Sequence, residues 1–310
     1  MELTAIVTVT DDGGSSGRLR RDFDVLPPGD VRNCMVALAR DETLMTSLFQ
    51  YRFATGRGLK GHSFGNLFLT ALTHLTGDFA SAIQASAQVL PVLGQIYPAT
   101  SSDVILQATL ANGHKVEGET KISRSKVRIE TISLKPANAK PLPAALNAIA
   151  NADLITMGPG SLFTSVIPNL LVKGIPEAIA ASPALKAYFV NLMSQPGETT
   201  DLRASEHVAA LLRHSARRTK RPILDVCVVN SAPIRGRVLN RYQQQTAIPV
   251  DNDIENLSRM GLTVIAADLL RMGRKHTDGK IRHDVGAIGA VAFELAQRGR
   301  RLQTKLKKAN

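Results

Sequence analysis

The chain has 310 residues, 44% of them apolar, and a formal net charge of +12. This content suffices for one large domain or two small ones. We find no run of about 18 apolar residues that would predict a membrane-spanning helix, and no signal peptide. The two cysteines, Cys34 and Cys227, offer neither a disulfide framework nor zinc-ligand spacing. A reducing, cytoplasmic setting is therefore expected.

Much of the basic excess lies in two blocks. One is a tail over residues 298–310, and the other contains Arg213, Arg217, Arg218, Lys220 and Arg221. Such blocks are typical of solvated surfaces. With four tyrosines, nine phenylalanines and no tryptophan, the chain has few side chains on which single-stranded bases would stack. Nucleic acid is therefore not an expected partner.

A polar loop follows the first apolar run of the chain. Residues 4–9 predict a strand buried on both faces, and Asp11-Asp12-Gly13-Gly14-Ser15-Ser16 follows directly. In open α/β sheets, ligands bind outside the carboxyl ends of the strands. Glycines let a ligand approach the backbone, serines donate hydrogen bonds, and aspartates hold a hydroxyl or hydrated Mg²⁺. The alternative is a plain surface turn in which aspartate is the turn former.

Two later loops have the same placement. Gly158-Pro159-Gly160-Ser161 follows a predicted strand over 152–157 and opens a helix, an arrangement that gathers anions. Gln195 follows a predicted strand over 187–193. Tight turns also use glycine without any ligand, so both interpretations stay open. We expect these loops to line one pocket with Asp11, Asp12 and Asn66.

Several helices are predicted around these loops. Asp30 is expected to cap a helix over 31–39, with Arg32 and Asn33 in its first turn, where backbone N–H groups attract anions. Helices are also expected over 63–75 and 79–90, with Asn66 facing a ligand near the start of the first.

Three glycine motifs suggest other functions. Residues 56–61 match the spacing of a dinucleotide-binding loop, and Asp78 follows, but no strand is predicted to present that carboxylate. Ser63 and Ser15 both lie in Gly-x-Ser-x-Gly patterns. Residue 63 lacks the preceding strand that a serine hydrolase needs, and no oxyanion motif lies upstream of Ser15. A dehydrogenase and a hydrolase are both disfavoured.

The remaining elements predict an α/β fold with a Rossmann-like, mostly parallel sheet and helices on both faces. An antiparallel excursion over 103–135 interrupts it, with Asn112-Gly113 as the hairpin turn, and is interpreted as a lid or dimer surface. Further elements are expected as strands over 104–110, 115–119, 126–134, 223–230 and 261–267, helices over 143–151 and 204–214, and a terminal helix opened by residues 281–284.

Four segments resemble one known family. They are TVTDDGGSSGRLRRDF with LPPGDVRNCMVALA in residues 8–39, GHSFGNLFLTAL (61–72), ADLITMGPGSLFTSVIPNLLVKGIPEAI (152–179) and NLMSQPGETTDL (191–202). The chain resembles the YvcK-like gluconeogenesis factor family, which is similar to the CofD-type 2-phospho-L-lactate transferase of coenzyme F420 biosynthesis. The resemblance covers nearly the whole chain and implies a single domain over 1–310.

The resemblance implies one cleft for a nucleotide diphosphate compound. Its first implication is a cytoplasmic UDP-sugar-binding regulator of cell shape under gluconeogenic growth, with UDP-N-acetylglucosamine as the favoured ligand, no required cofactor, and a homo-oligomeric state. Its second is a transferase that moves a phospholactyl group from a GDP-linked donor to a deazaflavin alcohol with Mg²⁺. Whether the chain is an enzyme is left open. The ligand-binding residues are expected to be Gly13, Gly14, Ser15, Ser16, Asn33, Asn66, Gly158, Pro159, Gly160, Ser161, Gln195, Tyr242 and Arg282, with Asp11 and Asp12 orienting an acceptor or metal and Asp11 as the Mg²⁺ ligand in an enzyme.

Members of the resembled family usually begin one strand–loop–helix unit earlier, with a glycine-rich turn of the GGGTG kind. That first strand and turn are expected to be missing from the sequence as numbered, which would leave the strand over 4–9 short of a neighbour. Weak UDP-sugar binding, restored by an upstream extension, is the corresponding expectation.

Overall fold

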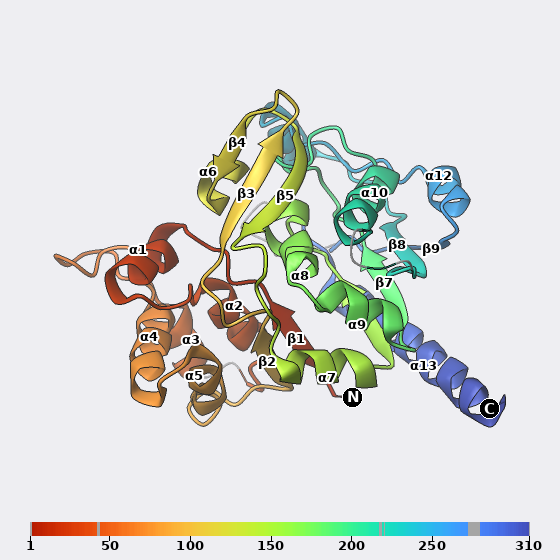
Figure 1. The fold of residues 1–310 in the computed structure, drawn as a ribbon. Coiled ribbons are helices and arrows are strands. Elements are labelled where there is room, and N and C mark those ends of the chain that lie inside the picture. The colour runs from red at the N-terminus through yellow and green to blue at the C-terminus, as the bar shows by residue number, and fades with distance from the viewer. Residues whose placement is uncertain (1, 42–43, 217–218, 220, 272–279, 310) are drawn as a thin grey trace.

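The computed structural model describes residues 2–41, 44–216, 219, 221–271 and 280–309 (Figure 1). Its strands form a parallel pair, an antiparallel sheet of order β4-β3-β5 and a parallel sheet of order β6-β7-β8-β9. The strands are β1 (Thr4–Val7), β2 (Gln95–Pro98), β3 (Ile105–Leu110), β4 (Lys115–Glu117), β5 (Ile129–Lys135), β6 (Leu154–Met157), β7 (Leu185–Phe189), β8 (Val226–Asn230) and β9 (Thr263–Ala267).

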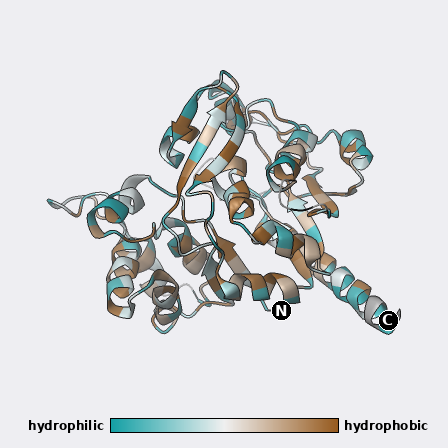
Figure 2. Cartoon of the chain, in the orientation of Figure 1, coloured by the Kyte–Doolittle hydropathy of each residue, from teal (hydrophilic) through white to brown (hydrophobic). Residues whose placement is uncertain are grey.

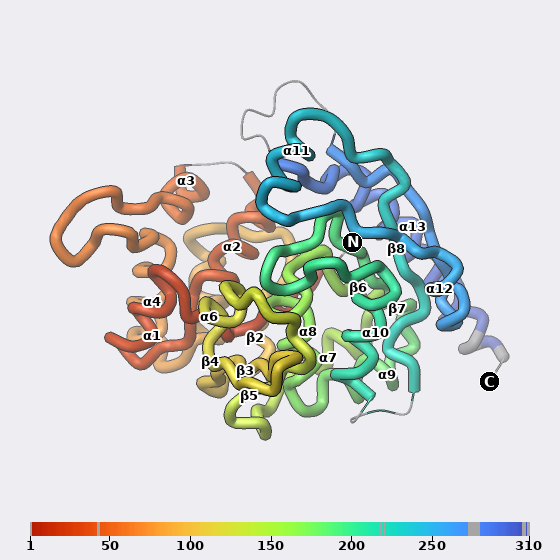
Figure 3. The backbone as a smooth tube through the Cα atoms, turned by 90° about the horizontal axis from the view of Figure 1, so that it is seen from above, coloured from red at the N-terminus to blue at the C-terminus, as the bar shows by residue number. Residues whose placement is uncertain are grey.

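Helices fill the connections between strands, as expected of an α/β fold. They are α1 (Gly14–Phe23), α2 (Gly29–Ala37), α3 (Leu44–Gln50), α4 (Phe64–Thr76), α5 (Phe79–Ser86), α6 (Glu119–Ser123), α7 (Pro143–Asn151), the π-helix η1 (Leu162–Val166), α8 (Ile167–Leu171), α9 (Ile175–Ala181), α10 (Ala204–Ser215), α11 (Arg237–Gln244), α12 (Ile254–Arg259) and α13 (Val285–Ala309). Figure 3 shows α1 to α4 on one side of the molecule and α10 to α13 on the other.

Alternating side chains of the parallel sheet enter two different apolar cores, because successive residues of a strand point to opposite faces. In β8, Cys227 and Val229 belong to the large core, whereas Val226 and Val228 belong to a smaller one beneath α13. The predicted sheet with helices on both faces is therefore confirmed. Figure 2 shows β1 in brown, while the outer turns of α13 carry teal. Cys34 and Cys227 are free thiols.

The structure corrects several expected boundaries. The first strand ends at Val7, and only that residue of β1 is fully buried, because β1 pairs with β2 alone among the described strands. Helix α2 begins at Gly29 with Pro28 as its N-cap, so Asp30 lies inside the first turn and does not cap it. Asp78 instead caps α5, where its carboxylate accepts from the Ser81 amide at 2.9 Å. That helix ends at Ser86, four residues earlier than expected.

Several elements were not predicted, among them β2, α6 and the helices α1, α3, α11 and α12. Strand β2 pairs in parallel with β1, from Thr4 opposite Gln95 to Val7 opposite Pro98. Helix α6 starts at Glu119, at the end of the segment that was expected to continue as a strand. The basic segment over 298–309 is not an irregular tail but the last turns of α13.

No single helix among the described residues has both the length and the apolar character to cross a membrane. The continuous helix η1–α8 and the helix α9 reach that length and apolar character only together. The two are bent by 79° relative to each other.

Candidate functional site

The loop after β1 is held by its own first carboxylate. Asp11 Oδ1 accepts a hydrogen bond from the Gly13 amide at 2.8 Å, and Gly13 is the N-cap of α1. Its other oxygen faces α2, since a Cβ at Gly29 would lie 2.7 Å from Asp11 Oδ2 and overlap the Ser16 hydroxyl. Glycine at position 29 therefore lets α2 approach the loop closely.

The second carboxylate binds the antiparallel insert. Asp12 Oδ1 accepts from the Thr120 amide at 2.8 Å and from the Thr120 hydroxyl at 2.6 Å. Gly118, with φ +96°, leaves room for Asp12 Oδ2, which a Cβ would overlap. The neighbouring Thr10 hydroxyl donates to Glu119 Oε2 at 3.2 Å. Asp12 thus fixes the start of α6 above the loop, and any part it takes in orienting an acceptor stays a prediction.

We expect Thr120→Val to lower the free energy of unfolding by about 1.5 kcal/mol, because one of two hydrogen bonds to a carboxylate is lost. Thermal unfolding should then shift down by roughly 3–6 °C. Thr304→Val, which removes an exposed hydroxyl bonded to the Arg300 carbonyl on α13, is the matched control and should change stability by less than about 0.5 kcal/mol. Equal melting temperatures for both variants would contradict an anchoring role for Thr120.

Acidic side chains gather beneath α6. Burial, followed by the charge of Asp11, raises the pKa of Asp30 to about 6. Burial, followed by the charges of Asp30 and Asp11, raises the pKa of Glu119 to about 8. Within the described ranges, no three His, Cys, Asp or Glu residues have a geometry that would hold a metal ion. The raised pKa values of Asp30 and Glu119 place the titration of both carboxyl groups near neutral pH.

These two groups give stability a distinct pH dependence. Because their pKa values are raised in the folded state, the folded chain holds more protons than the unfolded chain between the ordinary and raised values, a window that runs from 4.5 to about 8 for Glu119. The free energy of unfolding should therefore fall as pH rises, by at most about 1.4 kcal/mol per pH unit for each group.

Urea unfolding at pH 5, 6, 7 and 8 measures this slope, and Glu119→Gln should flatten it. Glu117→Gln is the control, because that side chain is exposed and its pKa is lowered rather than raised, by its hydrogen bond to Lys135. Identical slopes in the native chain and in Glu119→Gln would contradict the assignment.

A buried hydroxyl–imidazole pair lies at the start of α1. Ser15 Oγ is 3.1 Å from His62 Nδ1, and burial lowers the pKa of His62. No carboxylate in the described part of the chain forms an ion pair with this imidazole. Ser63 has a different partner, since its hydroxyl donates to the Phe49 carbonyl at 3.2 Å. A serine–histidine–acid triad is therefore not assembled at either serine.

Asn66 is deeply buried and only half satisfied. Its Nδ2 donates to Ser16 Oγ at 3.3 Å, while its Oδ1 has no hydrogen-bond partner. Asn66 is 2% exposed. A buried amide oxygen without a donor costs free energy, so this atom is a place where a ligand hydroxyl or N–H would be favourable.

Arg32 on α2 is a buried cation at this site. Arg32 is 8% exposed, and its Nε has no hydrogen-bond partner. No carboxylate among the described residues forms an ion pair with its guanidinium. Burial, with the nearby charge of Arg52, lowers the pKa of this guanidinium, and Asp30 and Asp11 partly offset that effect. Helix α4 crosses it at Gly65, where a Cβ would lie 2.8 Å from Arg32 Cγ. The chain thus keeps a desolvated cation with free donor capacity.

Hydrogen bonds connect the glycine loop after β6 to the loop after β7. Asn191 Oδ1 accepts from the Gly160 amide at 3.0 Å, and Asn191 Nδ2 donates to the Gly160 carbonyl at 2.8 Å. Gln195 Nε2 donates to Ser161 Oγ at 2.8 Å, whereas Gln195 Oε1 is buried without a partner. Gly158 has φ +69° and Pro159 is exposed. The Gly160 amide, expected to meet an anion, is occupied by Asn191.

Glu198 joins this second set of loops to α6. Its Oε1 accepts from Ser123 Oγ and from Thr164 Oγ1, each at 3.1 Å, and its Oε2 is buried without a partner. Burial raises the pKa of Glu198, and its charge in turn contributes to the raised pKa of Glu119. Figures 1 and 3 both place α6 between α1 and α8. Helix α6 thus bridges two polar loop sets, the loop after β1 and the loops after β6 and β7. That these loops line one pocket with Asn66 stays a prediction.

Of the remaining predicted residues, Tyr242 and Arg282 lie outside these two loop sets. Tyr242 on α11 accepts a hydrogen bond from the Ile281 amide at 3.2 Å, which holds it beside the exposed Arg282. Asn33 is exposed on α2, and Gly14 is exposed at the start of α1. Their ligand roles stay predictions.

Glu119, Glu198 and His62 were not among the predicted site residues, although they supply much of the local polarity. Glu119 looked like the end of a strand, and Glu198 is followed by threonines in an irregular loop. Only the Gly-His-Ser-Phe-Gly sequence around His62 carried a signal. Its match to a hydrolase motif was disfavoured, and the segment was interpreted as a loop and helix start with no role for His62.

Comparisons with known proteins agree with this architecture. The family described as 2-phospho-L-lactate transferase CofD matches residues 1–270. A Nostoc sp. relative is 50% identical over 292 residues, which make up 94% of this chain but 63% of the relative. The Bacillus subtilis gluconeogenesis factor is 43% identical over 295 residues, 95% of this chain and 90% of that protein. The chain thus spans less than two thirds of the Nostoc relative.

A crystal structure of protein BH3568 from Bacillus halodurans superposes with a TM-score of 0.89 at 43% identity, covering 94% of this chain and 91% of that one. This similarity in sequence and fold spans both loop sets and the insert that carries α6. The chain belongs to the CofD family, among relatives described as gluconeogenesis factors.

Proposed function

We propose that the chain is a cytoplasmic nucleotide-sugar-binding protein, with UDP-N-acetylglucosamine as the favoured ligand, that supports cell shape during gluconeogenic growth. The observation that carries the proposal is the buried, unpaired Arg32 beside the half-satisfied Asn66. A diphosphate supplies the anion that this guanidinium lacks, and a sugar hydroxyl supplies the donor that Asn66 Oδ1 lacks.

The other site groups suit the same ligand. Asp11 Oδ2 and the Ser16 hydroxyl both lie next to Gly29, so a hydrogen-bond acceptor and a hydroxyl for a ligand stand close together on this loop. Tyr242 has an aromatic face for stacking on a base or sugar, and Arg282 beside it is a second candidate for the diphosphate. Binding is proposed to need no metal, since a cation would compete with Arg32 for the anion.

Isothermal calorimetry with UDP-N-acetylglucosamine, UDP-glucose, UDP and GDP, each with and without EDTA, tests the proposal. We expect saturable binding of the UDP-sugars that EDTA does not change, and weaker binding of UDP alone because the contact with Asn66 is lost. Asn66→Ala should erase the difference between UDP-sugar and UDP, whereas Asn151→Ala, on the exposed end of α7, should preserve it. Absence of binding to every UDP compound would refute the proposal.

The second candidate is transfer of a phospholactyl group from a GDP-linked donor to a deazaflavin alcohol. One observation favours it: Glu119, whose pKa is raised to about 8, lies close enough to Asp11 for their charges to interact, and such a pair supplies a carboxylate that can accept the acceptor's proton. Incubation with donor, acceptor and Mg²⁺, scored for product rather than for binding, separates the two functions. Product formation that Glu119→Gln abolishes would favour the transferase.

The proposed homo-oligomeric state is measured independently by light scattering over a range of chain concentrations. A mass of one chain at every concentration would contradict it.

A further inference from the structure

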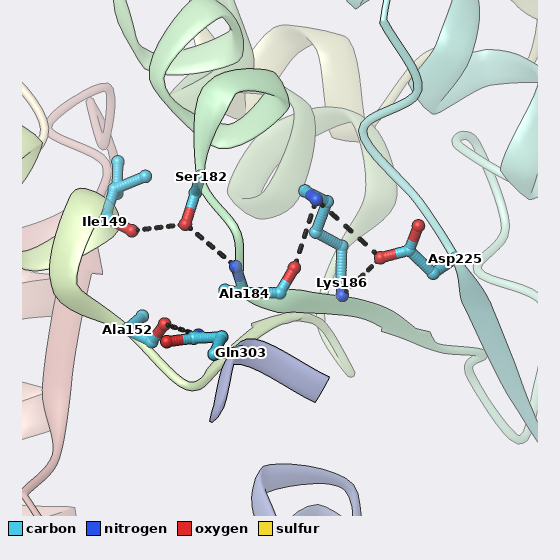
Figure 4. Close-up of polar contacts among 7 residues, drawn as sticks. All are labelled: Ile149, Ala152, Ser182, Ala184, Lys186, Asp225 and Gln303. Atoms are coloured by element: carbon cyan, nitrogen blue, oxygen red, sulfur yellow. Dashed lines mark hydrogen bonds and ion pairs between the residues drawn. The ribbon is translucent and has the colours of Figure 1, made fainter. Parts of the chain in front are cut away.

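A groove lies at the opposite end of the parallel sheet from the loops after β6 and β7. It has a volume of about 430 Å³ and lies where β7, β8 and β9 begin, against the C-terminal half of α13. Its floor is apolar, with Leu185 and Val226 among its residues, and its charged groups are Lys186, Arg298 and Lys305 with one carboxylate. Figure 4 shows the polar contacts of three of its lining residues, Ala184, Lys186 and Asp225.

Two contacts fix α13 against this end of the sheet. Gly299 packs so closely on the start of β6 that a Cβ there would overlap the Asp153 carbonyl and lie 3.3 Å from Leu185 Cβ. One turn later, Gln303 Nε2 donates to the Ala152 carbonyl at 2.9 Å (Figure 4). The wall of the groove is thus held by backbone contact and does not depend on its basic side chains.

The charges of the groove do not balance. Lys186 is 8% exposed, and its Nζ donates to the Ala184 carbonyl at 3.0 Å and lies 3.8 Å from Asp225 Oδ2 (Figure 4). That carboxylate also accepts from the Lys186 amide at 2.9 Å. Asp225 therefore compensates the buried lysine. Arg298 and Lys305 form no ion pair with any carboxylate in the described ranges, which leaves two cations facing one small groove.

We propose that this groove is a second ligand site, which binds a small phosphorylated molecule. The phosphate is held by Arg298 and Lys305, and the carbon body lies on the apolar floor. The volume falls within the range of about 300–1,000 Å³ that is typical of small-molecule sites. The proposal is independent of the UDP-sugar site, because the two share no residue and lie at opposite ends of the strands.

The experiment uses the full chain with Arg32→Gln as background, so that anions do not report on the first site. Inorganic pyrophosphate and ribose 5-phosphate are titrated by calorimetry at two salt concentrations. Arg298→Gln combined with Lys305→Gln should weaken binding by about 10- to 100-fold, since two charge-assisted contacts are lost. The matched control combines Arg300→Gln and Arg301→Gln, two exposed cations of the same helix that do not line the groove.

An unchanged affinity in the first double variant would overturn the proposal. So would equal weakening in both double variants, because this would show that only the overall positive field attracts the anion. Binding of a DNA duplex that depends on Arg298 and Lys305, in the absence of binding to either phosphate probe, would replace the proposed ligand with a nucleic acid.

Discussion

Gly17→Ala is expected to lower the free energy of unfolding by about 3 kcal/mol and the melting temperature by roughly 6–12 °C. A Cβ at this position on α1 would overlap the carbonyl group of Asp12, and backbone atoms cannot rotate away as a side chain does. Helix α1 must then move off the loop after β1. This displacement separates Ser15 from His62 and loosens the attachment of α6 to Asp12.

The control is Gly289→Ala in α13, where a Cβ meets nothing within 4 Å. Alanine is the better helix former, so this variant should be neutral or stabilised by up to about 1 kcal/mol. Thermal unfolding followed by circular dichroism measures both variants. A Gly17→Ala chain as stable as the native one would show that the loop after β1 tolerates displacement.

Arg32→Gln should weaken ligand binding without lowering the stability of the protein. In the proposed complex, at least two charge-assisted hydrogen bonds to the diphosphate are lost, so affinity for UDP-N-acetylglucosamine should fall by about 100-fold or more. The ligand-free protein should be as stable as before or more stable, because the chain no longer buries an unpaired cation.

Arg259→Gln removes one charge from an exposed pair with Glu255 and serves as its control, with both affinity and stability unchanged within error. Calorimetry and thermal unfolding on the same preparations give both readings. A destabilised Arg32→Gln chain that still binds the ligand would contradict the proposed role of the guanidinium.

Elements with strong local signals were predictable from the sequence. Pro143 at the first position, followed by a run of apolar and helix-favouring residues, gave both ends of α7, and the Asn112-Gly113 turn predicted the β3–β4 hairpin. The apolar run of β8 predicted a buried strand and was correct in its C-terminal end at Asn230.

Elements defined by tertiary contacts were not predictable in this way. Strand β2 has four residues and ends in Pro98, so its pattern is too short to stand out, and its pairing with β1 decides its conformation. Helix α6 has five residues and is separated from β4 by Gly118 alone, and it is held by Asp12 and Glu198 from distant parts of the chain. The raised pKa of Glu119 follows from the same assembly.

Helix α6 also provides a way to measure how often the connection between the two loop sets opens. The Thr120 amide is bonded to Asp12, and Ser123 of the same helix is bonded to Glu198. Exchange of the Thr120 amide hydrogen with deuterium requires the hydrogen bond to Asp12 to break. The exchange rate therefore reports how often α6 detaches from the loop after β1. A ligand that bridges both loop sets slows that exchange by the factor with which it depopulates the open state, and this single amide thereby reports on both loop sets.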